Sequence, residues 1–157
     1  MLQRVQSILL LITSLAMATF LATNSFVKTF GSNEKIVVNA YHFLHTKGAL
    51  VVLEKPIYYI ATAAALALIL TIFTIFQYKN RIRQMLLVAL NSLLIGVTLA
   101  ASVYHIQNDA IKIAGTGQES GYYIGIYAAF IALASNWLAN RFIRKDEKLV
   151  KDADRMR

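Results

Sequence analysis

The chain has 157 residues, of which 57% are hydrophobic, and a net charge of +8. It is long enough for one domain and more apolar than an average soluble domain, in which about 45–50% of residues are apolar. It contains no cysteine, which excludes disulfides, thiol redox chemistry and cysteine-ligated metals. Seven of the sixteen Lys and Arg lie at or after Arg141, and this clustering argues against a general nucleic-acid surface.

Four apolar runs, whose interiors lack Asp, Glu and Lys, predict membrane-spanning helices at residues 5–27, 57–78, 84–106 and 122–143. Each run has about twenty residues, enough to cross a hydrocarbon layer of about 30 Å. Backbone groups in lipid must bond to one another, so helices are expected. The expected fold class is an all-α membrane protein in a single domain, 1–157. It is a four-transmembrane-helix bundle with a small extracytoplasmic β-hairpin and a cytoplasmic C-terminal helical extension.

The segment between the first two runs is too long for a plain turn and is rich in β-branched and aromatic residues. A turn at His45-Thr46-Lys47-Gly48, with Gly48 free to adopt a positive φ, predicts a β-hairpin over residues 35–54. A lone two-stranded hairpin is marginal in water, so it is expected to pack on helix ends, lipid headgroups or another chain. The second outer loop, residues 107–121, contains Gly115-Thr116-Gly117 and is expected to be irregular.

The distribution of Lys and Arg predicts that both termini are cytoplasmic. Eleven of these cations lie near the N-terminus, in the link between the second and third runs, and in the C-terminal tail. Only five lie in the two other loops. Because the side of a membrane protein richer in Lys and Arg stays in the cytoplasm, the hairpin is expected outside.

Asn91 and Asn136 are the most informative polar residues within the apolar runs. Each lies eight positions from a boundary cation, Arg83 and Arg144 respectively. Eight positions of helix span about 12 Å, so both amides are expected at one depth on antiparallel helices. We interpret them as a helix–helix polar contact worth about 0.6–2 kcal/mol. The alternative is a polar lining for a substrate path, which is less favoured because no ionisable residue joins them.

The three histidines, His42, His45 and His105, do not predict a cofactor site. A haem held between helices needs histidines that face one another at membrane depth. His105 lies at the end of the third run, and the other two lie in the predicted hairpin, three positions apart. Residues three apart on a strand point to opposite faces. We therefore expect no cofactor, no metal ligand and no catalytic residue.

Small residues indicate a close helix contact at the start of the fourth run. Gly121 and Gly125 form a GxxxG pattern, a spacing that lets two backbones approach each other. An internal seam of the bundle is favoured over a contact between copies of the chain.

The tail, residues 144–157, contains no Gly or Pro and is expected to continue the fourth helix. It would either rest on anionic lipid, where each cation contributes about 1 kcal/mol, or dock on a protein partner through an apolar stripe. A nucleic-acid or ribosome contact by this tail stays open, without specific support. The candidate partner or lipid contacts are Phe142, Arg144, Lys145, Lys148, Leu149, Lys151, Arg155 and Met156.

Several short motifs on the predicted cytoplasmic side resemble a bacterial family of small four-helix inner-membrane proteins of unknown function. The resemblance implies fold and location in the bacterial inner membrane, and it implies no activity, ligand or catalytic residue. The residues that carry it are Met1-Leu2-Gln3-Arg4-Val5-Gln6, Tyr78-Lys79-Asn80-Arg81 with Gln84, Leu90-Asn91, Asn136, Arg144-Lys145-Asp146-Glu147 and Asp154-Arg155-Met156-Arg157.

The function most consistent with these features is a non-catalytic accessory or scaffold subunit of an inner-membrane complex, in secretion or respiratory machinery. Its expected partners are the lipid bilayer and membrane-protein subunits. One alternative is a small transporter or channel, although ion-coupled transport normally requires an ionisable residue within the bilayer. A second alternative is a haem- or quinone-binding membrane protein.

Overall fold

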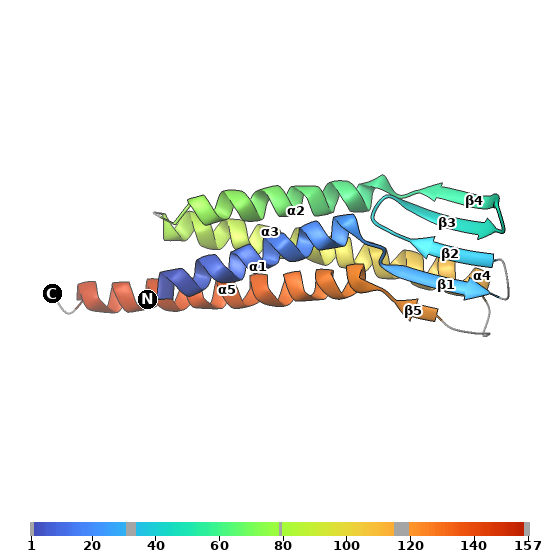
Figure 1. Cartoon of the computed structure of the whole chain (residues 1–157). Coiled ribbons are helices and arrows are strands. Elements are labelled where there is room, and N and C mark those ends of the chain that lie inside the picture. Colours follow the sequence, from blue (N-terminus) through green and yellow to red (C-terminus); the bar gives the residue numbers. More distant parts are fainter. Residues whose placement is uncertain (1, 31–33, 79, 115–119, 156–157) are drawn as a thin grey trace.

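The computed structural model describes residues 2–30, 34–78, 80–114 and 120–155. Long helices lie side by side and a β-sheet extends from one end of them; α1 begins and α5 ends at the opposite end (Figure 1). α1 packs against α2 and α5, and α3 packs against the same two helices. The helical elements are α1 (Leu2–Ala22), α2 (Tyr58–Phe76), α3 (Arg81–His105), the π-helix η1 (Ile106–Ile111), α4 (Lys112–Ala114) and α5 (Ile124–Arg155).

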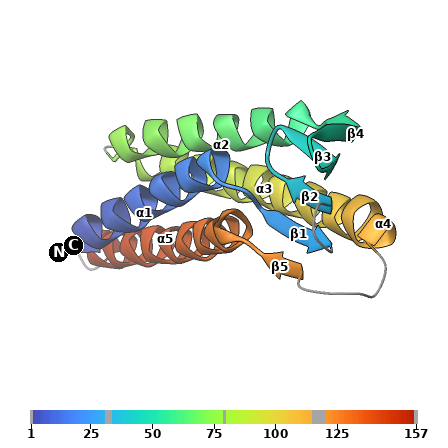
Figure 2. The ribbon, with the colours of Figure 1, turned by 45° about the vertical axis from the view of Figure 1, so that its right-hand side comes forward.

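The sheet has five antiparallel strands in the order β4-β3-β2-β1-β5. In chain order these are β1 (Phe26–Phe30), β2 (Glu34–Val38), β3 (His42–Lys47), β4 (Leu50–Pro56) and β5 (Ser120–Tyr122). Gly48 has a φ of 61° in the turn between β3 and β4, as the sequence predicted. α3, η1 and α4 follow one another directly along the chain. Figure 2 shows that the last part of this continuous helical segment runs along the sheet, where β2 contacts η1.

The expectation of an all-α four-helix membrane bundle is wrong, because strands within residues 26–30, 34–56 and 120–122 build this sheet. α1 ends at Ala22 and β1 begins at Phe26, inside the run predicted to be helical to residue 27. The predicted two-stranded hairpin over 35–54 is only part of the sheet. The loop 107–121, predicted to be irregular, instead contains the helical residues 107–114 and the first two residues of β5. The aromatic and β-branched side chains of Phe26 and Val27 suit both a helix in lipid and a half-buried strand, which explains the error at the end of the first run.

Among the described residues, three helical segments are long and apolar enough to cross a membrane: Val5–Ala22, Tyr58–Phe76 and Arg81–Ile111. α5 covers the fourth predicted run and continues through the tail to Arg155, but it is not one of these three. Its apolar stretch is interrupted by Asn136, Asn140 and Arg141. α5 is therefore a more polar helix than the sequence interpretation assumed.

One apolar core connects the helices with the sheet. Phe20 of α1, Ile60 of α2, Ile106 of η1 and Ile126 of α5 pack in the same buried cluster as the inward side chains of the sheet. The sheet contributes Phe26, Ile36, Val38 and Phe43, each at most 2% exposed. Burial alternates along β2, so one face of the sheet belongs to the core and the other faces outward.

The segment between α1 and β1 is clamped by backbone hydrogen bonds. Ser25 N donates to Val38 O at 2.8 Å, and Tyr123 N donates to Ser25 O at 3.0 Å. Gly125 N donates to Asn24 O at 3.0 Å. A Cβ atom placed on Gly125 would lie 2.7 Å from that same Asn24 oxygen, so this position requires glycine. Gly121, the other member of the GxxxG pattern, has open space where its Cβ would be.

We predict that Gly125→Ala lowers the free energy of unfolding by about 1–3 kcal/mol, because the new methyl group overlaps backbone atoms that cannot move freely. Gly121→Ala is the matched control, and its effect should stay within about 0.5 kcal/mol. Unfolding of both purified variants in the same detergent, followed by circular dichroism, measures the difference. Equal stability of the two variants would contradict the proposed clamp.

Candidate functional site

The structure brings Asn91 of α3 and Asn136 of α5 into direct contact. Asn91 Nδ2 donates to Asn136 Oδ1 at 3.1 Å and to Thr71 Oγ1 of α2 at 2.8 Å. Asn136 Nδ2 donates to Val88 O at 3.0 Å and to Ser92 Oγ at 2.8 Å. Both asparagines are at most 1% exposed. These bonds form a buried amide layer that joins α2, α3 and α5.

A second polar bond lies close to this layer along the chain. Thr13 Oγ1 of α1 and Ser135 Oγ of α5, the neighbour of Asn136, are 2.8 Å apart. All four N–H donors of the two asparagine amides are used within the protein, whereas Asn91 Oδ1 is buried without a partner. The layer therefore holds helices together and offers no free amide N–H to a substrate.

A cluster of titratable side chains lies where the helices meet the sheet. His105, at the end of α3, is only 4% exposed. Its Nε2 atom is hydrogen-bonded to the Tyr59 hydroxyl of α2, and its Nδ1 atom to Asp109 Oδ2 of η1. Lys55 Nζ of β4 lies 3.2 Å from the same Asp109 oxygen. The Lys55–Asp109–His105–Tyr59 cluster thus connects β4, η1, α3 and α2.

The π-helix η1 begins directly after His105 and carries Asp109 four positions further on. Such wide turns are rare and frequently occur at functional sites. The Tyr104 ring meets the His105 ring edge-on, with centroids 5.6 Å apart and an interplanar angle of 86°. Burial, two hydrogen bonds and this ring contact hold the imidazole in one orientation.

The cluster is a continuous chain of polar contacts. Lys55 contacts the Asp109 carboxylate, Asp109 is bonded to one ring nitrogen of His105, and the other ring nitrogen is bonded to the Tyr59 hydroxyl. Both ring nitrogens of the buried imidazole are therefore satisfied. A carboxylate, an imidazole and a hydroxyl occur in the same order in nucleophilic triads, here with a phenol in the hydroxyl position.

Sequence reasoning missed this cluster, having found no constellation among the histidines and acidic residues. The i,i+4 spacing of His105 and Asp109 was an available signal, since such residues share a helix face. Nothing in the sequence indicated Tyr59 or Lys55, because their proximity depends on how α2 and β4 pack. His42 and His45 both lie on β3, separate from the cluster.

The predicted contact residues of the tail extend along α5 beyond the paired helices. Arg81 Nη1 at the start of α3 lies 3.3 Å from Asp146 Oδ2, which ties the start of the tail to the bundle. Lys151 Nζ lies 3.4 Å from Glu147 Oε1, four positions before it on α5. Phe142 is half-buried, and Arg155 ends α5, whereas Met156 lies outside the described residues. Arg144, Lys145, Lys148, Leu149 and Lys151 are exposed.

The hydrogen bonds of the amide layer predict which of its two asparagines contributes more to stability. Asn136→Leu removes three hydrogen bonds and Asn91→Leu removes two, so Asn136→Leu should cost more stability. We expect about 1–2 kcal/mol for Asn136→Leu and about 1 kcal/mol for Asn91→Leu. Unfolding in mixed micelles, with Leu93→Ala on an exposed position of α3 as the control, measures both. A larger effect of Asn91→Leu would contradict this assignment of bonds.

A second prediction concerns the Lys55–Asp109–His105–Tyr59 cluster. Asp109→Asn removes the charge that pairs with Lys55 and orients the imidazole, and should cost about 1–3 kcal/mol. Because Lys55 belongs to β4, amides of that strand should exchange with solvent faster. Glu54→Gln, a neighbouring exposed carboxylate on β4, is the control. Unchanged exchange in Asp109→Asn would show that the cluster does not hold β4 in place.

Comparison with known families gave one result. A family model described as Domain of unknown function (DUF4293) matches residues 2–156. The predicted resemblance to an uncharacterised family is thereby confirmed. Comparison with curated proteins gave no match.

Proposed function

We propose that this chain, which belongs to the DUF4293 family, is a non-catalytic accessory or scaffold subunit of a bacterial inner-membrane protein complex. In this proposal α1, α2 and α3 cross the membrane, and α5, which packs along α1 and α3, brings the chain back to the side on which α1 begins. The length and hydropathy of three helical segments support a membrane location. The excess of cations at the end of the molecule that carries the tail supports cytoplasmic termini. The sheet would then lie outside the cytoplasm.

The observation that carries the proposal is the exposure of β4, an edge strand of the sheet. All seven of its residues are exposed. Four consecutive apolar side chains, Leu50, Val51, Val52 and Leu53, are between 45% and 75% exposed. An exposed apolar edge strand invites pairing with another chain and is normally protected.

The bilayer is poorly placed to cover this strand. β4 leads directly into α2, and Leu50 lies at the end of the strand that is distant from the helices (Figure 1). A protein partner is therefore the better match for these side chains. Within the ladder His45 pairs with Leu53 and Thr46 with Val51, so Val52 is skipped. Because such a bulge interrupts regular pairing, we propose contact mainly through side chains.

The tail of α5 provides a second contact surface at the other end of the molecule. Leu149 and Val150 are 51% and 40% exposed, among the exposed cations of the tail. An apolar pair surrounded by cations suits an acidic protein surface or anionic lipid. We favour a scaffold over a small transporter or channel, because the amide N–H groups of Asn91 and Asn136 are already engaged with each other and with neighbouring helices.

The topology can be tested directly because the chain has no native cysteine. Ala49→Cys, in the exposed β3–β4 turn, should react with a membrane-impermeant thiol reagent added to intact cells. Asn80→Cys, at the start of α3, should react only after the membrane is opened. The reverse labelling pattern would invert the proposed orientation, and labelling of both sites in intact cells would exclude it.

The partner proposal is tested by substituting the bulged residue. Val52→Glu places a charge on the apolar strand at a position without a ladder partner, so the fold should be retained while the partner is lost. Tyr41→Glu, at an exposed position in the turn between β2 and β3, is the matched control. We expect the wild type and Tyr41→Glu to migrate in a complex larger than the single chain after mild solubilisation, and Val52→Glu to lose at least one subunit.

A truncation after Ile143 separates the two surfaces. If the tail forms its own contact, the truncated chain should insert and keep the β4 partner while losing another. A wild-type chain that migrates alone, or a Val52→Glu variant that keeps every subunit, would refute the scaffold function.

A further inference from the structure

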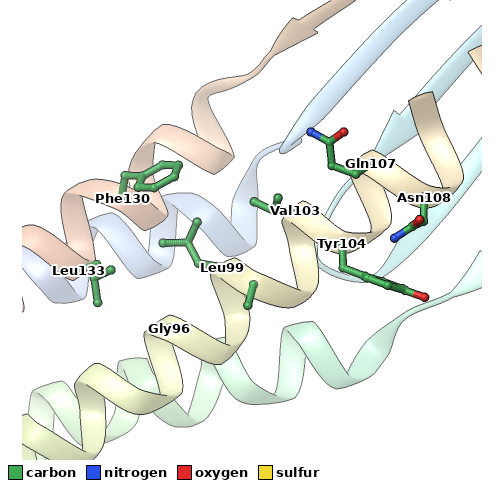
Figure 3. Close-up of a pocket in the computed structure, with 9 residues that line it drawn as sticks. Gly96, Leu99, Val103, Tyr104, Gln107, Asn108, Phe130 and Leu133 are labelled. Atoms are coloured by element: carbon green, nitrogen blue, oxygen red, sulfur yellow. The ribbon is translucent and has the colours of Figure 1, made fainter. Parts of the chain in front are cut away.

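Two surface hollows of different character border α5. The larger is a groove of about 630 Å³ between α3 and α5, with Leu99 and Phe130 on its two sides (Figure 3). Its lining is mainly apolar, and none of the nine described residues that form it is charged. The second hollow, which we call the arginine pocket, has a volume of about 350 Å³ and lies nearer the C-terminal end of α5. The described residues that line the arginine pocket are Trp137, Asn140, Arg141 and Arg144.

The arginine pocket contains two cations that are not paired with a carboxylate. Arg141 and Arg144 lie three positions apart on α5, and both are exposed. The Arg141 guanidinium carbon lies 5.9 Å from the centroid of the Trp137 ring, a distance typical of a cation–π contact. Asp146, the nearest acidic residue along the chain, pairs with Arg81 instead. Within the described part of the chain no carboxylate lies within 4 Å of either pocket arginine, so both charges can bind an external anion.

The contacts between α3 and α5 give the depth of the arginine pocket. Arg81 pairs with Asp146, and Asn91 pairs with Asn136, ten positions further on α3 and ten positions earlier on α5. The two pocket arginines lie two and five positions before Asp146, or about 3–8 Å from the start of α3 toward the amide layer. In the proposed topology α3 begins at the cytoplasmic boundary of the membrane. Both guanidinium groups therefore lie at the depth of the lipid head groups.

The part of α5 that precedes the pocket suits the hydrocarbon layer. From Ile124 to Asn140 the helix contains no charged residue, so Arg141 is its first charge. Ala134 and Trp137 precede Arg141 by seven and four positions, a spacing that places all three on one helix face. Ala134 is exposed, and Trp137 is 58% exposed. A molecule on this face would meet apolar surface first and two cations at its edge.

We propose that the arginine pocket binds the phosphate group of an anionic phospholipid. The guanidinium groups of Arg141 and Arg144 would donate charge-assisted hydrogen bonds to the phosphate oxygens. The Trp137 indole would pack against the glycerol backbone and the first methylene groups, since indoles favour this interface. A zwitterionic lipid fits less well, because its amine would bring a third positive charge to the two arginines.

A soluble phosphate compound would offer the same head-group chemistry. The depth of the pocket and the exposed indole favour the lipid, because a soluble compound would leave Trp137 uncovered. The inference rests on the proposed membrane location and not on any protein partner.

The test uses Trp137 as the reporter, because it is the only tryptophan of the chain. Phosphatidylglycerol with brominated acyl chains is titrated into the purified full-length protein in a neutral maltoside detergent, and quenching of the tryptophan fluorescence reports contact. Brominated phosphatidylcholine is titrated in parallel. We expect phosphatidylglycerol to bind at least about tenfold more tightly. Arg141→Gln and Arg144→Gln should each reduce this preference about fivefold or more.

Arg83→Gln is the matched control. Arg83 is an exposed cation of α3 near the same membrane boundary, and it is not among the described residues that line the pocket. Its substitution removes the same charge and should change the preference less than about twofold. Circular dichroism should show equal folding of all variants.

Three results would overturn the proposal. The first is equal quenching by the two lipids, and the second is an equal loss of preference in Arg83→Gln and Arg144→Gln, which would indicate general attraction to a cationic surface. The third is displacement of the lipid by glycerol 3-phosphate at equal concentration, which would identify a soluble ligand. The partner experiments on β4 can fail or succeed independently, since the titration uses the isolated chain.

Discussion

The contact between Asn24 and Gly125 determines how the two halves of the molecule meet. Asn24 follows the end of α1 and Gly125 lies in the first turn of α5, so their contact fixes the outer end of one helix against the start of another. The chain leaving α1 can then enter the sheet only along β1. β1 pairs with β2 on one edge and with β5 on the other, and β5 leads directly back to α5. A side chain at residue 125 would disturb both connections.

The same packing explains where the polar side chains of the helices face. α5 has the lowest apolar character of the long helices, yet its two most informative polar residues, Ser135 and Asn136, face other helices and not the surroundings. Since a buried amide without partners is costly, Asn136 strengthens the helix arrangement only if α2, α3 and α5 keep their present positions. Ser135 and Asn136 lower the hydropathy of α5, and they also help to specify its neighbours.

The features with functional interest occupy three levels of the molecule. The exposed apolar strand β4 lies at the far end of the sheet, the Lys55–Asp109–His105–Tyr59 cluster lies at the junction, and the arginine pocket lies nearer the C-terminal end of α5. Lys55 connects the strand to the cluster, and Tyr104 connects the cluster to the groove. A partner on β4 would therefore contact a strand that is joined to the junction cluster through Lys55. This arrangement suits a subunit that is assembled into a larger membrane complex.

The sequence by itself determined the helices and the polar contact between them. Uncharged runs of about twenty residues predicted the bounds of α2 and α3 closely. The absence of Gly and Pro in the tail predicted the continuous α5. Equal spacing from boundary cations placed Asn91 and Asn136 at one depth. These features depend on local composition and on helix geometry, which are readable from spacing alone. Gly48 was identified for the same reason, since its turn is local.

Only the tertiary structure decided the sheet, the junction cluster and the groove. Phe26 and Val27 were predicted as the end of an apolar helix, and they belong to β1 because β2 and β5 pair with that strand from residues 34–38 and 120–122. The side chains of Lys55, Tyr59, His105 and Asp109 meet because β4, α2 and α3 converge at one point, and neither their spacing nor their composition encodes that meeting. The groove likewise requires α3 and α5 to lie side by side. Long-range pairing depends on the packing of whole elements, and a periodicity in one segment carries no information about which distant segment will cover it.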